Sequence, residues 1–202
     1  ELIQGDFAVL CEPTSALIEG GCNGTIRVEV SASGVKAHSA RPWMGENAIH
    51  KLAPALEKLA SYQPETVNVD GLDYRESLNA VLASAGIASN VIPDQATLTV
   101  NYRFAPSRTG EEAEAMLREF FAGYEVRVTD LAVGARPGLN TPQAQAFMAS
   151  LGSEVKPKYG WTDVARFSSL GIPAVNYGPG DPSLAHADNE NVPVGHLFDC
   201  EA

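Results

Sequence analysis

Residues 34–52, GVKAHSARPWMGENAIHKL, join a segment with strand character to a segment with helical character. Apolar side chains alternate over residues 25–30, which is typical of a strand, and recur at helical spacing over residues 46–60. The loop between them carries His38 and Arg41. Loops held by rigid elements at both ends often carry binding and catalytic groups. A histidine with a purely structural hydrogen bond is the commoner alternative, and the residues alone leave both open.

The elements around this loop predict a small α+β domain. Residues 78–87, 94–104 and 124–128 have strand character, and a capping box at Thr109 and Glu112 begins a second helix. The order strand, helix, strand, strand, helix, strand predicts a ferredoxin-like sandwich of about 110 residues. We place this domain at residues 24–134.

The two ends of the chain have a different character. Residues 7–11 and 172–176 are short apolar runs of the kind found in buried strands of α/β sheets, and helical patterns lie between residues 141 and 171. Such elements on both sides of an antiparallel insert indicate one α/β domain split in sequence by another domain. We therefore expect residues 1–23 and 135–202 to belong to an incomplete α/β catalytic domain, and the chain to be a fragment.

Composition excludes several classes of function. The 202 residues are 45% hydrophobic and carry a net charge of −11, which argues against nucleic acid as a partner. No apolar run approaches the roughly 18 residues that span a bilayer, and no signal sequence is evident. We expect a cytoplasmic protein without a membrane partner. Three widely spaced cysteines predict neither a disulfide framework nor a cysteine zinc site.

Three side chains are candidates for chemistry. Glu12 and His186 each follow a short apolar strand, so both could lie at the carboxyl edge of one sheet, where α/β proteins place ligands. A carboxylate and an imidazole suit zinc, although a solvated loop acid and a loop histidine are equally simple interpretations. Arg103 lies on the polar face of residues 94–104, either as a solvated residue or as a carboxylate-binding one.

Several motifs together resemble the zinc-dependent aminoacylase and carboxypeptidase superfamily. They are Gly34-x-x-x-His38-Ser39-x-x-Pro42-x-x-Gly45-x-Asn47-Ala48-Ile49, Cys11-Glu12-Pro13-Thr14, the segment GWTDVARF at residues 160–167, and Leu184-Ala-His186-Ala-Asp-Asn-Glu190. The resemblance implies that Glu12 and His186 each bind one of two zinc or cobalt ions. It also implies a homodimer formed through the inserted domain. His38 would reach the partner subunit's active site and donate a hydrogen bond to the oxyanion.

The resemblance further implies that Asn90, Arg103, Thr162 and Arg166 bind the substrate. The spacing before Arg166 is one residue longer than usual, and Cys22-Asn23 stands where a basic residue is often found. The superfamily's upstream His-x-Asp and its catalytic Glu-Glu pair have no counterpart here, because the capping box accounts for Glu111-Glu112. We therefore expect the fragment alone to bind zinc poorly and to hydrolyse nothing.

Three segments resemble one branch of the superfamily in detail. They are ARPWMGENAIHKL, KYGWTDVARF and NYGPGDPSLAH. The branch hydrolyses the succinyl amide of N-succinyl-LL-2,6-diaminopimelate in lysine and diaminopimelate biosynthesis. An acetylornithine deacetylase or amino-acyl carboxypeptidase with the same metals is an alternative. For the fragment alone, a non-catalytic dimerisation module is another.

Overall fold

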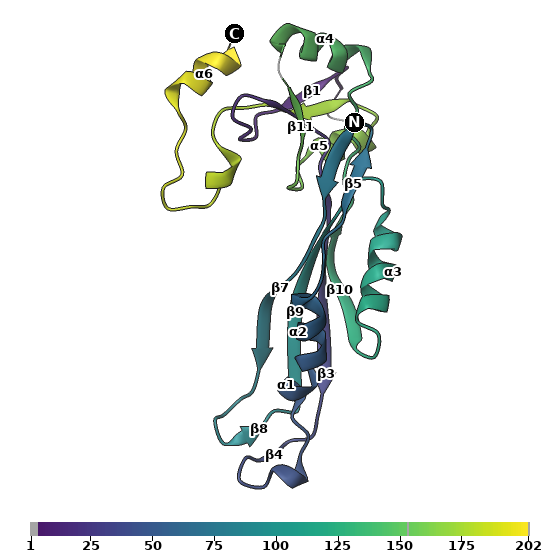
Figure 1. Cartoon of the computed structure of the whole chain (residues 1–202), viewed down its shortest axis with the longest axis vertical. Coiled ribbons are helices and arrows are strands. Elements are labelled where there is room, and N and C mark those ends of the chain that lie inside the picture. The colour runs from purple at the N-terminus through teal and green to yellow at the C-terminus, as the bar shows by residue number, and fades with distance from the viewer. Residues whose placement is uncertain (1–3, 153, 202) are drawn as a thin grey trace.

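A long antiparallel sheet extends away from a smaller mixed sheet (Figure 1). The computed structural model describes residues 4–152 and 154–201. Neighbouring strands of the long sheet are antiparallel, in the order β10 (Glu125–Ala132), β3 (Gly24–Ser33), β9 (Gln95–Phe104) and β7 (Ser77–Ala85). Helices α1 (Ala48–Lys51), α2 (Ala53–Ala60) and α3 (Gly110–Phe120) pack against one face of it. This order is consistent with the expected ferredoxin-like sandwich.

The core of this part follows from strict alternation along β9. Its five inward side chains are at most 2% exposed: Ala96, Leu98, Val100, Tyr102 and Phe104. They pack with the inward side chains of β3 and with Ala113, Leu117 and Phe121. Burial of each large apolar side chain contributes about 1.5–3 kcal/mol, which makes this face the main source of the sheet's stability. The predicted alternation of residues 94–104 is thus confirmed.

The prediction of one helix over residues 46–60 is wrong. The helix is interrupted at Leu52, and Pro54 lies in the first turn of α2, where its missing N–H is tolerated. Leu52 is buried, whereas Ile49 and Leu56, two other apolar residues of this stretch, are 48% and 44% exposed. The helical pair therefore carries apolar side chains on its outer face as well. Leu170, which directly follows α5 (Val164–Ser169), is 61% exposed.

The smaller sheet has the order β1 (Ala8–Leu10), β12 (Ala174–Asn176), β2 (Ile18–Gly20) and β11 (Val155–Pro157). β1 pairs parallel with β12, and β2 pairs parallel with β11 and antiparallel with β12. Helix α4 (Pro142–Leu151) packs against Val175, while α5 packs against Ala174. Adjacent residues of a strand point to opposite faces, so these helices cover the two faces of the sheet. β2 and β11 were not predicted, because their sequences Ile-Glu-Gly and Val-Lys-Pro lack the continuous apolar runs that mark β1 and β12.

Two short two-stranded ribbons complete the described structure, together with α6 (Val194–Glu201) and the 3-10 turns η1 (Pro42–Met44) and η2 (Pro182–Leu184). β5 (Thr66–Val69) and β6 (Leu72–Arg75) are joined by Asp70-Gly71, both with positive φ. Asp-Gly is a strong hairpin signal that our sequence analysis did not use. Tyr74 donates its hydroxyl hydrogen to the carbonyl of Gly20 over 2.6 Å, which joins this hairpin to β2.

The second ribbon, β4 (Ala37–His38) with β8 (Val91–Ile92), lies at the end of the long sheet remote from the mixed sheet (Figure 1). Within the part of the chain that the structure describes, no helix has the length and apolar character needed to cross a bilayer.

The capping box of α3 gives a stability prediction. Thr109 accepts a hydrogen bond from the backbone N–H of Glu112, whose carboxylate accepts one from the backbone N–H of Thr109. We expect Thr109→Ala to lower the free energy of unfolding by about 1 kcal/mol in chemical denaturation. Ser107→Ala, an exposed control on the same loop, should change it by less than about 0.5 kcal/mol. Equal effects of the two substitutions would contradict the role of the cap.

Candidate functional site

Glu12 and His186 line one cavity of about 450 Å³ beside the mixed sheet. Glu12 follows β1, and His186 follows the turn η2 after β12. β1 and β12 are parallel neighbours, so the chain leaves both strands at the same edge of the sheet. Thr162, Glu19 and Lys158 line the cavity as well. The tertiary structure thus brings together residues from the two ends of the sequence.

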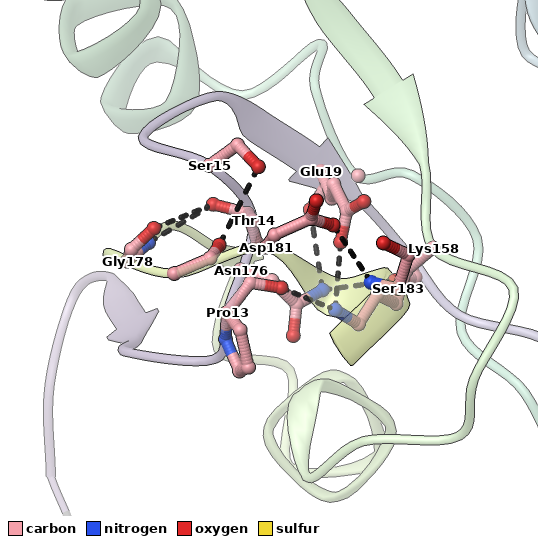
Figure 2. Close-up of polar contacts among 12 residues, drawn as sticks. Pro13, Thr14, Ser15, Glu19, Lys158, Asn176, Gly178, Asp181 and Ser183 are labelled. Atoms are coloured by element: carbon pink, nitrogen blue, oxygen red, sulfur yellow. Dashed lines mark hydrogen bonds and ion pairs between the residues drawn. The ribbon is translucent and has the colours of Figure 1, made fainter. Parts of the chain in front are cut away.

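The backbone around Glu12 is held by its contact with the segment after β12. Thr14 donates its hydroxyl hydrogen to the carbonyl of Gly178 over 3.1 Å and accepts the N–H of Gly178 over 3.0 Å (Figure 2). A Cβ atom at Gly178 would lie 2.5 Å from the carbonyl oxygen of Glu12. Only glycine permits so close an approach, so this contact limits the positions open to the Glu12 backbone.

His186 is exposed and has an unusual backbone conformation. Its φ is 67°, in the left-handed region that few residues other than glycine adopt. The backbone N–H of His186 donates to the carboxylate of Glu190 over 3.2 Å, which holds the turn. Unusual dihedrals of this kind are often found at functional sites.

Thr162 and Arg166 lie differently with respect to the cavity. Thr162 is 4% exposed, lines the cavity, and its Oγ1 has no hydrogen-bond partner among the described residues. Its carbonyl accepts a contact from the Cys22 thiol, whose pKa is raised by burial. Arg166 is not among the lining residues. It forms a 3.0 Å ion pair with Asp163 and lies over the ring of Trp161, which does line the cavity.

Arg103 lines a neighbouring cavity of about 400 Å³ that shares Tyr159 with the first. Its Nε donates to the side-chain carbonyl of Asn101 over 3.1 Å, and no ion pair to it is found within the described part of the chain. Burial, and then the charge of Arg27, lowers the pKa of the Arg103 guanidinium. Asn23, 1% exposed, lines the same cavity with its Oδ1 unpartnered. A half-buried cation beside an unused acceptor is suited to a polar ligand.

His38 is the last residue of β4 and Asn90 directly precedes β8, so both lie at the β4–β8 ribbon, remote from both cavities (Figure 1). The backbone N–H of Ser39 donates to the carbonyl of Asn90 over 2.9 Å. His38 Nδ1 accepts the N–H of Ala40 over 3.0 Å. In the neutral imidazole the proton must then be on Nε2, which remains available as a donor on an exposed side chain.

The cavity lined by Glu12 and His186 contains part of the ligand set that a divalent metal needs. Glu12 offers oxygen and His186 offers nitrogen, the donor types that zinc accepts. Among residues 4–152 and 154–201, no three His, Cys, Asp or Glu side chains are grouped as a metal site would require. The residues present therefore suit a metal centre that needs further ligands.

The sequence analysis missed Lys158, Glu19, Asn23 and Tyr159 as cavity residues. Glu19 lies on β2 and Lys158 directly follows β11. Neither strand was predicted, so no pattern placed these residues at the site. Asn23 was noted only because it stands where a basic residue is often found.

The chain thus has two parts. One is a mixed α/β sheet with a polar cavity at its carboxyl edge, and the other is an antiparallel sheet covered by helices on one face. The family model of the peptidase dimerisation domain (M20_dimer) matches residues 21–128, more than half of the chain. The chain therefore belongs to this family.

Two curated relatives are similar over almost the whole chain. One is the succinyl-diaminopimelate desuccinylase of Corynebacterium glutamicum, 48% identical over 208 aligned positions and 100% of this chain. The other, from Mycobacterium tuberculosis, has the provisional name succinyl-diaminopimelate desuccinylase DapE and is 53% identical over 197 positions and 96% of this chain. The chain spans 56% of the length of each relative.

Solved structures share the fold at lower identity. A tripeptidase from Staphylococcus aureus superposes with a TM-score of 0.73 at 20% identity, covering 98% of this chain and 55% of its own. An M20 family metallo-carboxypeptidase from Sulfolobus solfataricus superposes with a TM-score of 0.71 at 19% identity, covering 98% and 61%.

The unpartnered hydroxyl of Thr162 gives a second prediction. Replacing a buried group that has no partner by an apolar one of the same shape removes a desolvation cost. We expect Thr162→Val to leave the free energy of unfolding unchanged or higher. Thr14→Val is the matched control: Thr14 is equally buried, but its hydroxyl makes two hydrogen bonds, so the loss should be about 1–3 kcal/mol. A comparable loss for Thr162→Val would mean that its hydroxyl has a partner.

Proposed function

We propose that this chain is part of a cytoplasmic, metal-dependent amide hydrolase that removes succinate from N-succinyl-LL-2,6-diaminopimelate. The observation that carries the proposal is the common cavity of Glu12, His186 and Thr162. Its support is the name shared by two relatives that align with nearly the whole chain. In this proposal residues 24–134 are an inserted ferredoxin-like dimerisation domain, and residues 1–23 and 135–202 belong to the catalytic domain.

Glu12 and His186 would each contribute one ligand to a pair of zinc or cobalt ions. Such ions, when bound, polarise an amide carbonyl and activate water. The remaining ligands and the general base would come from outside this chain. Within it, the wall formed by Trp161 and Pro182 would shield the reacting amide from bulk solvent.

Three residues would bind the substrate from this chain's own side. Arg103 is suited to a substrate carboxylate, because it is a half-buried cation next to the first cavity. Thr162 would donate its unpartnered hydroxyl to the substrate. Arg166 would have to leave Asp163 to reach the cavity, so we assign it the outer rim.

His38 and Asn90 would act in the active site of the partner subunit. The ten residues of β3 separate them from their own chain's cavity by roughly 34 Å, far beyond hydrogen-bond reach. A second copy of the chain could bring the Nε2–H of His38 to that cavity, where a hydrogen-bond donor would stabilise a developing oxyanion.

The homodimer would use β7 and the helices next to it. β7 is an edge strand without a charged residue, and it exposes Val81 and Leu82. The opposite edge strand, β10, carries Glu125, Arg127 and Asp130. Charges protect a free edge from pairing, so the uncharged edge is the one suited to another chain. Helix α2, which contacts β7, adds the exposed Leu56.

A subunit-mixing experiment tests the function and the shared site together. In the complete protein, Glu12→Gln and His38→Ala should each lower kcat of the homodimer, His38→Ala by about 10²–10³-fold. In a mixed dimer with one subunit of each kind, one site has both an intact Glu12 and an intact His38, from different subunits. Mixing the two impaired variants should therefore raise the rate of succinate release above that of either variant alone.

No recovery on mixing would show that His38 and Glu12 act in the same subunit. Full activity of Glu12→Gln alone would remove the metal-ligand role, and with it the proposed function.

The choice of edge strand predicts an effect on assembly. We expect Leu82→Lys to give a monomer in sedimentation equilibrium at micromolar concentration, because a buried unpaired ammonium would destabilise the interface. Leu131→Lys on β10 is the control: this residue is also exposed, and the dimer should persist. A dimer in the first variant with a monomer in the second would assign the interface to β10.

A further inference from the structure

We propose that Lys158 is a positioning residue that sets the orientation of Glu12 for metal binding, acting through the carbonyl of Pro13. This inference rests on the proposed function, because it assigns a purpose to the geometry of that site. Lys158 is the first residue of the segment KYGWTDVARF, in which the sequence analysis assigned roles only to Thr162 and Arg166.

The ammonium of Lys158 is buried at the cavity wall. Lys158 is 8% exposed, and its backbone is fixed on both sides: its N–H donates to Gly20 over 3.3 Å, and its carbonyl accepts the N–H of Asn23 over 3.2 Å. A buried ammonium is costly unless it is paired and hydrogen-bonded. The side chain is thus held in place by its partners and by the sheet.

The partners of this ammonium come from two other segments. Lys158 Nζ donates to the carbonyl oxygen of Pro13 over 3.1 Å and lies 2.8 Å from Oε2 of Glu19 (Figure 2). The Glu19 side chain is 13% exposed. The Lys158 ammonium, at the end of β11, therefore contacts both β2 and the loop that follows β1.

Lys158 acts on Glu12 through its hydrogen bond to the carbonyl of Pro13, the next residue in the chain. Glu12 directly precedes Pro13, whose ring fixes its own φ and restricts the backbone of the residue before it. Gly178 approaches the Glu12 carbonyl closely enough to leave no room for a Cβ atom. Because Gly178 limits the position of the Glu12 carbonyl and Lys158 holds the next carbonyl, that of Pro13, Glu12 has few orientations for its carboxylate. Outer groups that orient a metal ligand raise metal affinity in this way.

Glu19 fixes Lys158 and is neutralised by it. Both line the cavity that contains Glu12 and His186. Without the ammonium, Glu19 would be a buried unpaired carboxylate, which destabilises a fold. A test must therefore separate this general cost from the specific effect on Glu12.

The test uses the complete protein and zinc as the probe, with zinc Kd measured by competition against a chromogenic chelator. Lys158→Met should raise the zinc Kd about 10- to 100-fold. Lys158→Arg, which keeps the charge and the donors, should retain most of the affinity. Lys156→Met, the same change at an exposed position on β11, should leave Kd unchanged.

The double variant Lys158→Met with Glu19→Gln separates positioning from stability. It removes the unpaired carboxylate, so unfolding of the metal-free protein should return toward that of the unmodified protein. Zinc Kd should stay raised, because nothing holds Pro13. A Kd restored to the unmodified value would overturn the inference and leave Lys158 as a structural counter-ion only.

The substitution Glu12→Gln distinguishes failure of the inference about Lys158 from failure of the proposed metal site. If it raises zinc Kd but the double variant does not, only the inference about Lys158 fails. If Glu12→Gln leaves zinc Kd unchanged, the proposed metal site itself is wrong.

Discussion

The pairing of β3 with β9 is the constraint on which the rest of the structure depends. Its register runs unbroken over ten residues, from Gly24 opposite Phe104 to Ser33 opposite Gln95. Arg103 therefore lies beside the cavities, while His38 and Asn90 are carried to the remote end. A hydrogen-bonded strand of this length is too stiff to fold back on itself, so one chain cannot bring these residues together. This separation is the physical basis of the proposal that the site is shared between subunits.

The cavity depends on a second constraint, the parallel pairing of β1 with β12. These strands have only three residues each, and their own hydrogen bonds are few. The contacts of Thr14 with Gly178 and of Lys158 with Pro13 extend the association beyond the strand ends. Because these polar groups are buried, losing one partner would leave the other desolvated and unpaired, which would lower the stability of the fold. The loop that carries Glu12 is consequently held by its surroundings rather than by the strand that precedes it.

Where the fold could be predicted, a long periodic signal was present. The ten residues of β9 alternate without exception, and the capping box at Thr109 marks the start of α3. The errors have equally local causes. Pro54 divides the predicted helix, and short strands such as β2 lack a continuous apolar run. The Asp70-Gly71 hairpin was available in the sequence and was overlooked.

The sequence by itself determined which side chains are candidates for chemistry, because motifs around Glu12, His38, Thr162 and His186 can be recognised without coordinates. It also determined the amphipathic pattern that forms the large sheet. Only the tertiary structure decided which candidates meet: Glu12 with His186 and Thr162 in one cavity, and His38 with Asn90 elsewhere. It alone brought Lys158 to Pro13 and Glu19. The physical reason is that contacts between residues distant in sequence depend on strand register and direction, which no local pattern encodes.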